Sequence, residues 1–150
     1  MLACGQRHVT KHPLNLDIAE DTSAADIVRL EAHLDAFNAE ATRLSDARFL
    51  SILLKDANGE MFAGLHGHTW GAMCQIKLLW IAEPHRGHGL GTRMLETAEA
   101  EARRRGCRQI MLMTHSFQAP DFYEMHGFER IVTVADSPVG HADILMIKQL

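Results

Sequence analysis

A glycine-rich segment at residues 86–91, which reads RGHGLG, has the composition to bind an anion. An apolar run that begins at Leu78 ends just before it, and a helical pattern starts directly after it. The first N–H groups of a helix lack partners within the helix, and the helix dipole favours negative charge there. Glycine lets an anion approach the backbone closely and permits a positive φ angle. The order of strand, glycine turn and helix therefore predicts a diphosphate-binding site.

Two well-known nucleotide-binding motifs do not match this segment. The ATP-binding P-loop needs Lys-Ser or Lys-Thr after its glycines, and neither pair follows here. The dinucleotide fingerprint needs GxGxxG, whereas Gly87, Gly89 and Gly91 give GxGxG. That fingerprint also has an acidic residue about twenty positions further on. Residues 107–113 read CRQIMLM and contain no carboxylate, so both nucleotide classes are disfavoured.

Hydrophobic periodicity predicts the elements that must position this turn. Strands are expected at residues 14–18, 49–55, 62–70, 75–82, 108–113, 128–135 and 144–147, and helices at 24–44, 90–105 and 119–126. The apolar face of the first helix is expected in the core, with a candidate break near Asn38. Gly64 and Gly67 are expected to weaken their strand, as happens at bulges. The elements indicate an α+β (mixed α/β) fold.

Composition narrows the class of protein. The 150 residues are most naturally one domain, residues 1–150, and the net charge of −4 argues against nucleic acid as the main partner. Three scattered cysteines give neither a disulfide framework nor a metal pair, which fits a reducing compartment. Ten histidines without an HExxH motif lead us to expect no metal. No apolar run reaches the length of a membrane span, so we expect a cytoplasmic protein.

A second motif at residues 116–128 reads SFQAPDFYEMHGF. Together with Arg86-x-x-Gly89-x-Gly91, one helix and one strand earlier, it resembles the signature of the GNAT (GCN5-related N-acetyltransferase) family. The resemblance implies the GNAT fold, a central twisted, mostly antiparallel sheet with splayed fourth and fifth strands, flanked by helices. It also implies direct transfer of an acetyl group from acetyl-CoA to a primary amine.

The resemblance carries roles onto matching positions of this sequence. The residues that it implies for binding acetyl-CoA are Trp80, Ile81, Ala82, Arg86, Gly87, His88, Gly89, Leu90, Gly91, Thr92 and Ser116. The family often has asparagine where Ser116 stands, and either this shorter serine or Gln118 would make the contact. Tyr123 is the implied general acid, because an ordinary phenol pKa of about 10 keeps it protonated at neutral pH. The alternative is that Tyr123 is a core aromatic residue.

The residue that takes the proton from the amine is left open. Some family members use a glutamate at the start of the fourth strand, but Met73 stands at that position. His115 is the first choice, because it follows the fifth strand and would lie near the thioester. Other candidates are Glu83, Glu40 and the strand pair of His66 and His68.

The acceptor site is expected around residues 37–40, residues 66–70 and Glu83, together with the loop at residues 136–141. The residues proposed to bind the acceptor are Phe37, Asn38, Glu40, His66, His68, Trp70 and Glu83. The side chains of His66, His68 and Trp70 share one strand face, which either lines a pocket or faces solvent. We expect a small-molecule amine, with aminoglycoside-like antibiotics among the candidates, or a peptide amine. The resemblance also implies a homodimer. The alternative function is a non-catalytic CoA-binding module that acts as a sensor or interaction partner.

Overall fold

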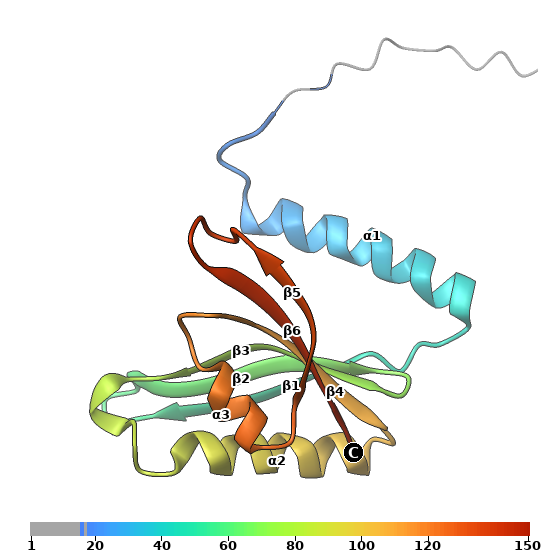
Figure 1. Ribbon diagram of the computed structural model, residues 1–150. Helices are drawn as coiled ribbons and strands as arrows, with labels where there is room; N and C mark the ends of the chain where they lie inside the picture. The colour runs from blue at the N-terminus through green and yellow to red at the C-terminus, as the bar shows by residue number, and fades with distance from the viewer. Residues whose placement is uncertain (1–15, 17) are drawn as a thin grey trace, which may run out of the picture. The chain divides into compact units, whose positions relative to one another are not determined.

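The computed structural model describes residues 16 and 18–150 (Figure 1). Its elements are α1 (Ala24–Thr42), β1 (Arg48–Lys55), β2 (Met61–Trp70), β3 (Met73–Ile81), the 3₁₀ helix η1 (Glu83–His85), α2 (Leu90–Arg104), β4 (Gln109–His115), α3 (Pro120–Met125), β5 (Glu129–Ala135) and β6 (Ala142–Gln149). Every strand expected between residues 49 and 147 is present, with ends within two residues of the prediction. The strand expected at 14–18 lies largely outside the described residues. Its described members, Leu16 and Ile18, are not in a strand.

The chain divides into two compact units, residues 1–38 and 39–150, and each is described by itself. The boundary falls within α1. Asp26 N–H donates to the Ser23 hydroxyl at 3.1 Å, which is the expected start of this helix. The helix continues past Asn38, so the break considered there is wrong. The structure shows no buried residue in α1. Because the two units are described separately, the expected core face of this helix stays a prediction. None of the described helices is long and apolar enough to cross a membrane.

Six strands form one sheet in the order β1-β2-β3-β4-β6-β5. All neighbouring strands are antiparallel except β3 and β4, which are parallel. The ladder between these two joins only residues 73–76 to residues 109–112, although the strands continue to Ile81 and His115. β3 and β4 therefore separate beyond Ile76. They correspond to the fourth and fifth strands of the sequence prediction, so the expected splay is confirmed.

A β-bulge lies where the two parallel strands begin to separate. Gly67 pairs with Ile76 and His66 pairs with Leu78, so Lys77 is the extra residue on β3. A bulge bends its strand and increases the local twist. Gly67 is required at this place, because a Cβ atom there would overlap the carbonyl oxygen of Gln75. The expected irregularity at Gly67 is confirmed.

The core lies between one face of the sheet and α2, with α3 on the same side (Figure 1). Along β2, buried residues alternate with half-buried ones, as expected when one face packs on a helix. The buried side chains of α2 are Met94, Leu95, Ala98 and Ala102. After α2, Gly106 has φ 84°, which suits the expected helix C-terminus. This packing fixes α2, and with it the glycine turn, against β3.

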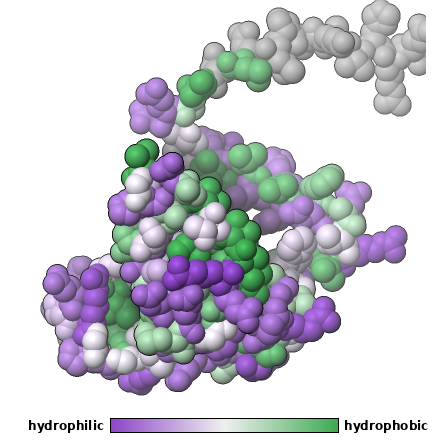
Figure 2. Space-filling model, viewed as in Figure 1, coloured by the Kyte–Doolittle hydropathy of each residue, from purple (hydrophilic) through white to green (hydrophobic). Residues whose placement is uncertain are grey.

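The edge strand β5 contributes little to this core. All seven of its residues are exposed, and Ile131, Val132 and Val134 each expose about half of their surface. Figure 2 shows hydrophobic surface gathered over β5 and β6. The elements around the point where β3 and β4 separate are these two strands, α2 and α3.

Candidate active site

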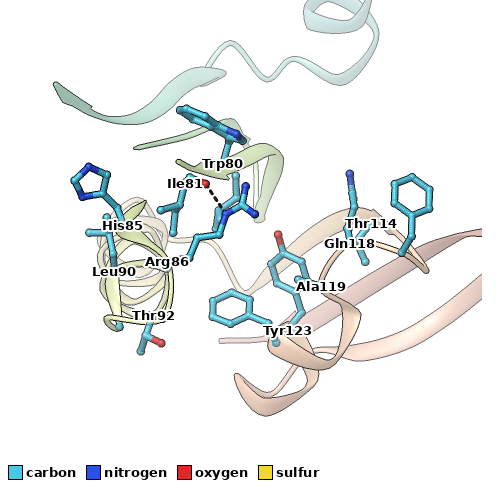
Figure 3. Close-up of a pocket in the computed structure, with 16 residues that line it drawn as sticks. Trp80, Ile81, His85, Arg86, Leu90, Thr92, Thr114, Gln118, Ala119 and Tyr123 are labelled. Atoms are coloured by element: carbon cyan, nitrogen blue, oxygen red, sulfur yellow. Dashed lines mark hydrogen bonds between the residues drawn. The ribbon is translucent and has the colours of Figure 1, made fainter. Parts of the chain in front are cut away.

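A cavity of about 770 Å³ extends from the diverging end of β3 to the end of β4 and α3 (Figure 3). Eight of the eleven residues predicted to bind the cofactor line it, namely Trp80, Ile81, Arg86, Gly87, Gly89, Leu90, Gly91 and Thr92. Lining residues that the sequence did not single out are Leu79, His85, Thr114, Phe117, Ala119 and Phe122. Phe117, Ala119 and Phe122 belong to the second motif, so the sequence could have indicated them. Thr114 and His85 carry no comparable sequence signal.

The glycine turn leaves the start of α2 open to an anion. Gly89 is the N-cap residue with φ 75°, and no side chain of the described residues caps the helix there. The N–H groups of the first turn are therefore available to a ligand. At Gly91 a Cβ atom would come within 3.2 Å of the Phe122 ring, so glycine also permits close packing of α2 on α3. The turn fits a diphosphate on geometric grounds.

Arg86 supplies positive charge beside this turn. Its Nε donates to the carbonyl oxygen of Ile81 at 2.8 Å, which holds the guanidinium beside the end of β3 (Figure 3). Guanidinium groups pair well with phosphate oxygens. Arg86 therefore complements the helix start as a second anion-binding element.

Tyr123 lies at the junction of two cavities. It lines the larger one, and with Leu79 and Gln118 it also lines a cavity of about 110 Å³ where β3 and β4 separate. Figure 3 shows its hydroxyl directed from α3 toward the side of β3 and Arg86. The side chain is buried, and burial raises the pKa of its phenol above the ordinary value. The hydroxyl therefore keeps its proton at neutral pH.

A histidine bridge joins α3 to the start of α2. His126 Nδ1 lies 2.7 Å from the carbonyl oxygen of Phe122, and Nε2 lies 3.0 Å from the Thr92 hydroxyl. A carbonyl oxygen only accepts hydrogen bonds, so Nδ1 carries a proton. The bridge couples the position of Thr92, in the first turn of α2, to the helix that carries Tyr123.

The three remaining residues predicted for the cofactor do not line the larger cavity. They are Ala82, His88 and Ser116. The Ser116 hydroxyl accepts a hydrogen bond from the Ala142 N–H at 3.0 Å and so joins the end of β4 to β6. Gln118 does line both cavities, and its Oε1 accepts from the Thr114 hydroxyl and the His115 N–H. Of the two alternatives, Gln118 is the one at the cavity.

His115 stands at the end of β4, beside the cavity rather than on its wall. Its neighbours Thr114 and Phe117 line the cavity. Its Nδ1 atom lies 2.5 Å from Oδ1 of Asp143. Nδ1 makes no regular hydrogen bond with the described residues, so the contact is a close polar pair. Sequence reasoning did not find Asp143, because the pairing of β4 with β6 determines this contact.

Among residues 39–150, those predicted to bind the acceptor do not line the larger cavity. Phe37, Asn38 and Glu40 are on α1, and Glu83 is exposed in η1. His66, His68 and Trp70 are half-buried on one face of β2, and His66 Nδ1 lies 2.7 Å from the Ser51 hydroxyl. The acceptor assignments stay predictions.

Comparison with known proteins identifies the family. A model of the Acetyltransferase (GNAT) family matches residues 16–128. The blasticidin-S acetyltransferase of Streptomyces morookaense is 36% identical over 113 residues, which is 73% of this chain and 83% of that protein. Acetyltransferase Atu2258 of Agrobacterium fabrum is 36% identical over 98 residues, which is 65% of this chain and 72% of that protein.

The fold agrees with this sequence similarity. A crystal structure of an acetyltransferase from Bacillus cereus matches with a TM-score of 0.71 at 28% identity, over 89% of this chain and 98% of that chain. The chain belongs to the GNAT acetyltransferase family. It is an N-acetyltransferase, as the two sequence motifs predict.

Proposed function

We propose that this N-acetyltransferase uses acetyl-CoA to acetylate a primary amine of a small molecule directly. One observation carries the proposal: a single cavity holds both the uncapped start of α2 and the buried hydroxyl of Tyr123. When bound, acetyl-CoA supplies a thioester, whose carbonyl carbon is open to attack and whose sulfur can leave. The sensor alternative gives no reason for a protonated hydroxyl at the junction of two cavities.

The residues that would hold acetyl-CoA bind chiefly through the backbone. The N–H groups at the start of α2 and the Arg86 guanidinium bind the diphosphate. Along residues 77–81 of β3, the edge that β4 has left presents backbone groups to the amides of the pantetheine arm. Gln118 presents its side-chain amide on the opposite wall.

Two side chains handle the protons in this proposal. Tyr123 donates a proton to the departing sulfur, and burial keeps that proton in place until it is needed. His115 takes a proton from the acceptor amine, either directly or through water. Cys74 and Cys107 are buried and do not line the larger cavity, and burial raises the pKa of the Cys74 thiol to about 11. We therefore propose transfer without a covalent enzyme intermediate.

The acceptor class is proposed from the relatives. A protein 36% identical over most of its length is named for acetylation of blasticidin S, which supports an antibiotic-sized amine. The acidic net charge of −4 suits a cationic acceptor. We propose such a small amine ahead of a peptide amine.

The test is CoA-thiol release from acetyl-CoA against a panel of amines. The panel holds blasticidin S, aminoglycosides, streptothricin-like compounds, polyamines, amino acids, arylalkylamines and a lysine-bearing peptide. We expect release above the no-acceptor rate with a small-molecule class. Release with the peptide alone would overturn the acceptor class. The absence of release with every amine of the panel, while acetyl-CoA still raises the melting temperature, would favour the sensor alternative.

Oligomeric state and compartment belong to the same proposal. We propose a homodimer formed through an edge strand, supported by the exposed apolar side chains of β5. Sedimentation that shows a monomer at micromolar concentration would contradict it.

We propose that the protein is located in the cytoplasm, supported by the free, buried thiols of Cys74 and Cys107.

A further inference from the structure

Two side chains, Asp143 and Phe117, contact the side chain of His115. His115 ends β4, and in the sheet it pairs directly with Asp143 of β6. Phe117 comes from the turn after β4. The loop between β5 and β6 supports these two contacts indirectly, because Ser137 binds Asp143 and His141 packs on Phe117.

Asp143 holds one edge of the imidazole. Its Oδ1 lies 2.5 Å from His115 Nδ1, and its Oδ2 accepts a hydrogen bond from the Ser137 hydroxyl at 2.9 Å. The carboxylate is thus fixed from the loop side while it faces the ring. Asp143 exposes only 23% of its side chain, so its charge acts at short range with limited screening by water.

Aromatic contacts fix the plane of the ring. His115 stacks on Phe117 with centroids 5.0 Å apart and planes 8° from parallel. His141 packs edge to face against the ring of Phe117, with centroids 4.9 Å apart. Because Phe117 lines the cavity, the stack connects His115 to the cavity wall.

Exposure distinguishes the two nitrogens of the ring. Nδ1 is shielded from solvent, yet the side chain as a whole is 36% exposed. The exposed surface therefore belongs to the rest of the side chain, which includes Nε2. The negative charge of a carboxylate 2.5 Å from Nδ1 favours, by electrostatic attraction, the tautomer with its proton on that atom, which leaves the lone pair on Nε2.

We propose that Asp143 is a positioning residue that holds His115 in the tautomer with a basic Nε2. The inference rests on the proposed function, in which His115 is the base. Nε2 takes one proton from the ammonium group of the acceptor, and the nitrogen lone pair thus released forms the C–N bond. As the C–S bond breaks, the sulfur receives a proton from Tyr123. The second proton that the nitrogen loses as the amide forms returns through water to the Tyr123 oxygen. Ser137 acts through Asp143 by holding its second oxygen.

The test combines nuclear magnetic resonance with a double-mutant cycle. We expect ¹⁵N shifts of His115 to show Nδ1 protonated in the wild-type protein, and Asp143→Asn to lower that population. Asp143→Asn should lower kcat about ten-fold or more, with KM for acetyl-CoA unchanged. The upper limit is the full contribution of a general base, roughly 10²–10⁴. In a His115→Ala background the same substitution should have no further effect on kcat.

Two further variants separate positioning from folding. Asp121→Asn removes the same charge from a carboxylate that is 88% exposed, and it should leave kcat unchanged. Ser137→Ala should lower kcat less than Asp143→Asn. It removes a single hydroxyl and should leave the protein folded, so it tests positioning even if Asp143→Asn unfolds the protein. An equal loss of kcat from Asp143→Asn with and without His115 would overturn the proposal, as would a wild-type proton on Nε2. The tautomer measurement needs no substrate, so it stands even if the proposed reaction fails.

Discussion

Tyr123 shows how burial can select a protonation state for one side chain. The phenol is buried against Phe122 and Phe128, and desolvation disfavours its anion. An ordinary thiol has a pKa of about 8.5, so full proton transfer from a phenol of higher pKa to a solvated thiolate is uphill. The transfer becomes favourable only where the sulfur is also desolvated. Exclusion of water from the site at Tyr123 would thus favour both the protonated phenol and the transfer of its proton to the sulfur.

Replacement of Tyr123 by phenylalanine tests this role. Tyr123→Phe should lower kcat by roughly 10²–10⁴, the contribution typical of general acid catalysis, with the affinity for acetyl-CoA nearly unchanged. The aromatic ring stays, so the melting temperature should change little. Turnover and calorimetric binding measure the two effects. Equal losses of rate and affinity would assign the hydroxyl to binding rather than proton transfer.

Residues in the two motifs could be predicted, because the motifs are local in sequence. The glycine turn and Tyr123 each lie within one short segment whose spacing carries the information. His115 and Asp143 are 28 positions apart in the sequence and meet only through the register of β4 on β6. Register depends on the packing of the whole sheet, so the sequence pattern did not contain this contact.

At the scale of elements, the start of α2 is built without a capping side chain. Gly89 occupies the left-handed region at the N-cap, where serine, threonine, aspartate or asparagine would usually satisfy a free N–H. The helix gives up that local stabilisation and keeps its N–H groups for a ligand. Binding and folding therefore compete for the same backbone groups.

A pair of glycine substitutions separates these two effects. Gly89 and Gly59 have φ of 75° and 86°, and a Cβ atom would meet nothing within 4 Å at either place. Alanine at either position should cost about 1–2 kcal/mol of stability through backbone strain. Only Gly89→Ala should weaken acetyl-CoA binding, because Gly59 lies in the β1–β2 turn. Thermal melts and calorimetry measure both. Equal affinity of the two variants would contradict the diphosphate assignment.

Element boundaries were predictable wherever periodicity and glycine agreed. α2 ends at Arg104 and Gly106 follows it, as the sequence indicates. The extent of α1 was predicted within two residues, but its continuity through Asn38 was not, because asparagine is only mildly unfavourable in a helix. The bulge at Lys77 follows from the close approach of Gly67 to β3, a contact between strands rather than a local pattern.

At the scale of the whole molecule, the core contains thiols that must stay neutral. Burial, followed by the nearby Cys107, raises the pKa of Cys74 from 9.0 to about 11, with Arg105 acting in the opposite direction. The unfolded chain loses this proton near pH 9, whereas the folded chain keeps it to about pH 11. The folded state therefore binds more protons in this range, and stability falls as the pH rises from 9 to 11.

Cys74→Ala tests this pH dependence. A shift of about two units corresponds to roughly 2–3 kcal/mol lost over the range. The variant should be less stable than the wild-type protein at pH 8, where only packing is lost. That deficit should shrink or reverse by pH 11, because alanine has no proton to lose. Urea unfolding at a series of pH values measures the difference. A deficit constant with pH would contradict the assigned cause.

The splay of β3 from β4 has a consequence for how this architecture diverges. The proposed recognition of acetyl-CoA along residues 77–81 and at the start of α2 depends on main-chain groups and a few glycines. Most side chains around these groups can change without loss of the cofactor. The Bacillus cereus acetyltransferase keeps the fold at 28% identity, which fits such tolerance. New acceptor specificities can thus be acquired on one half of the active site while the other half is inherited intact.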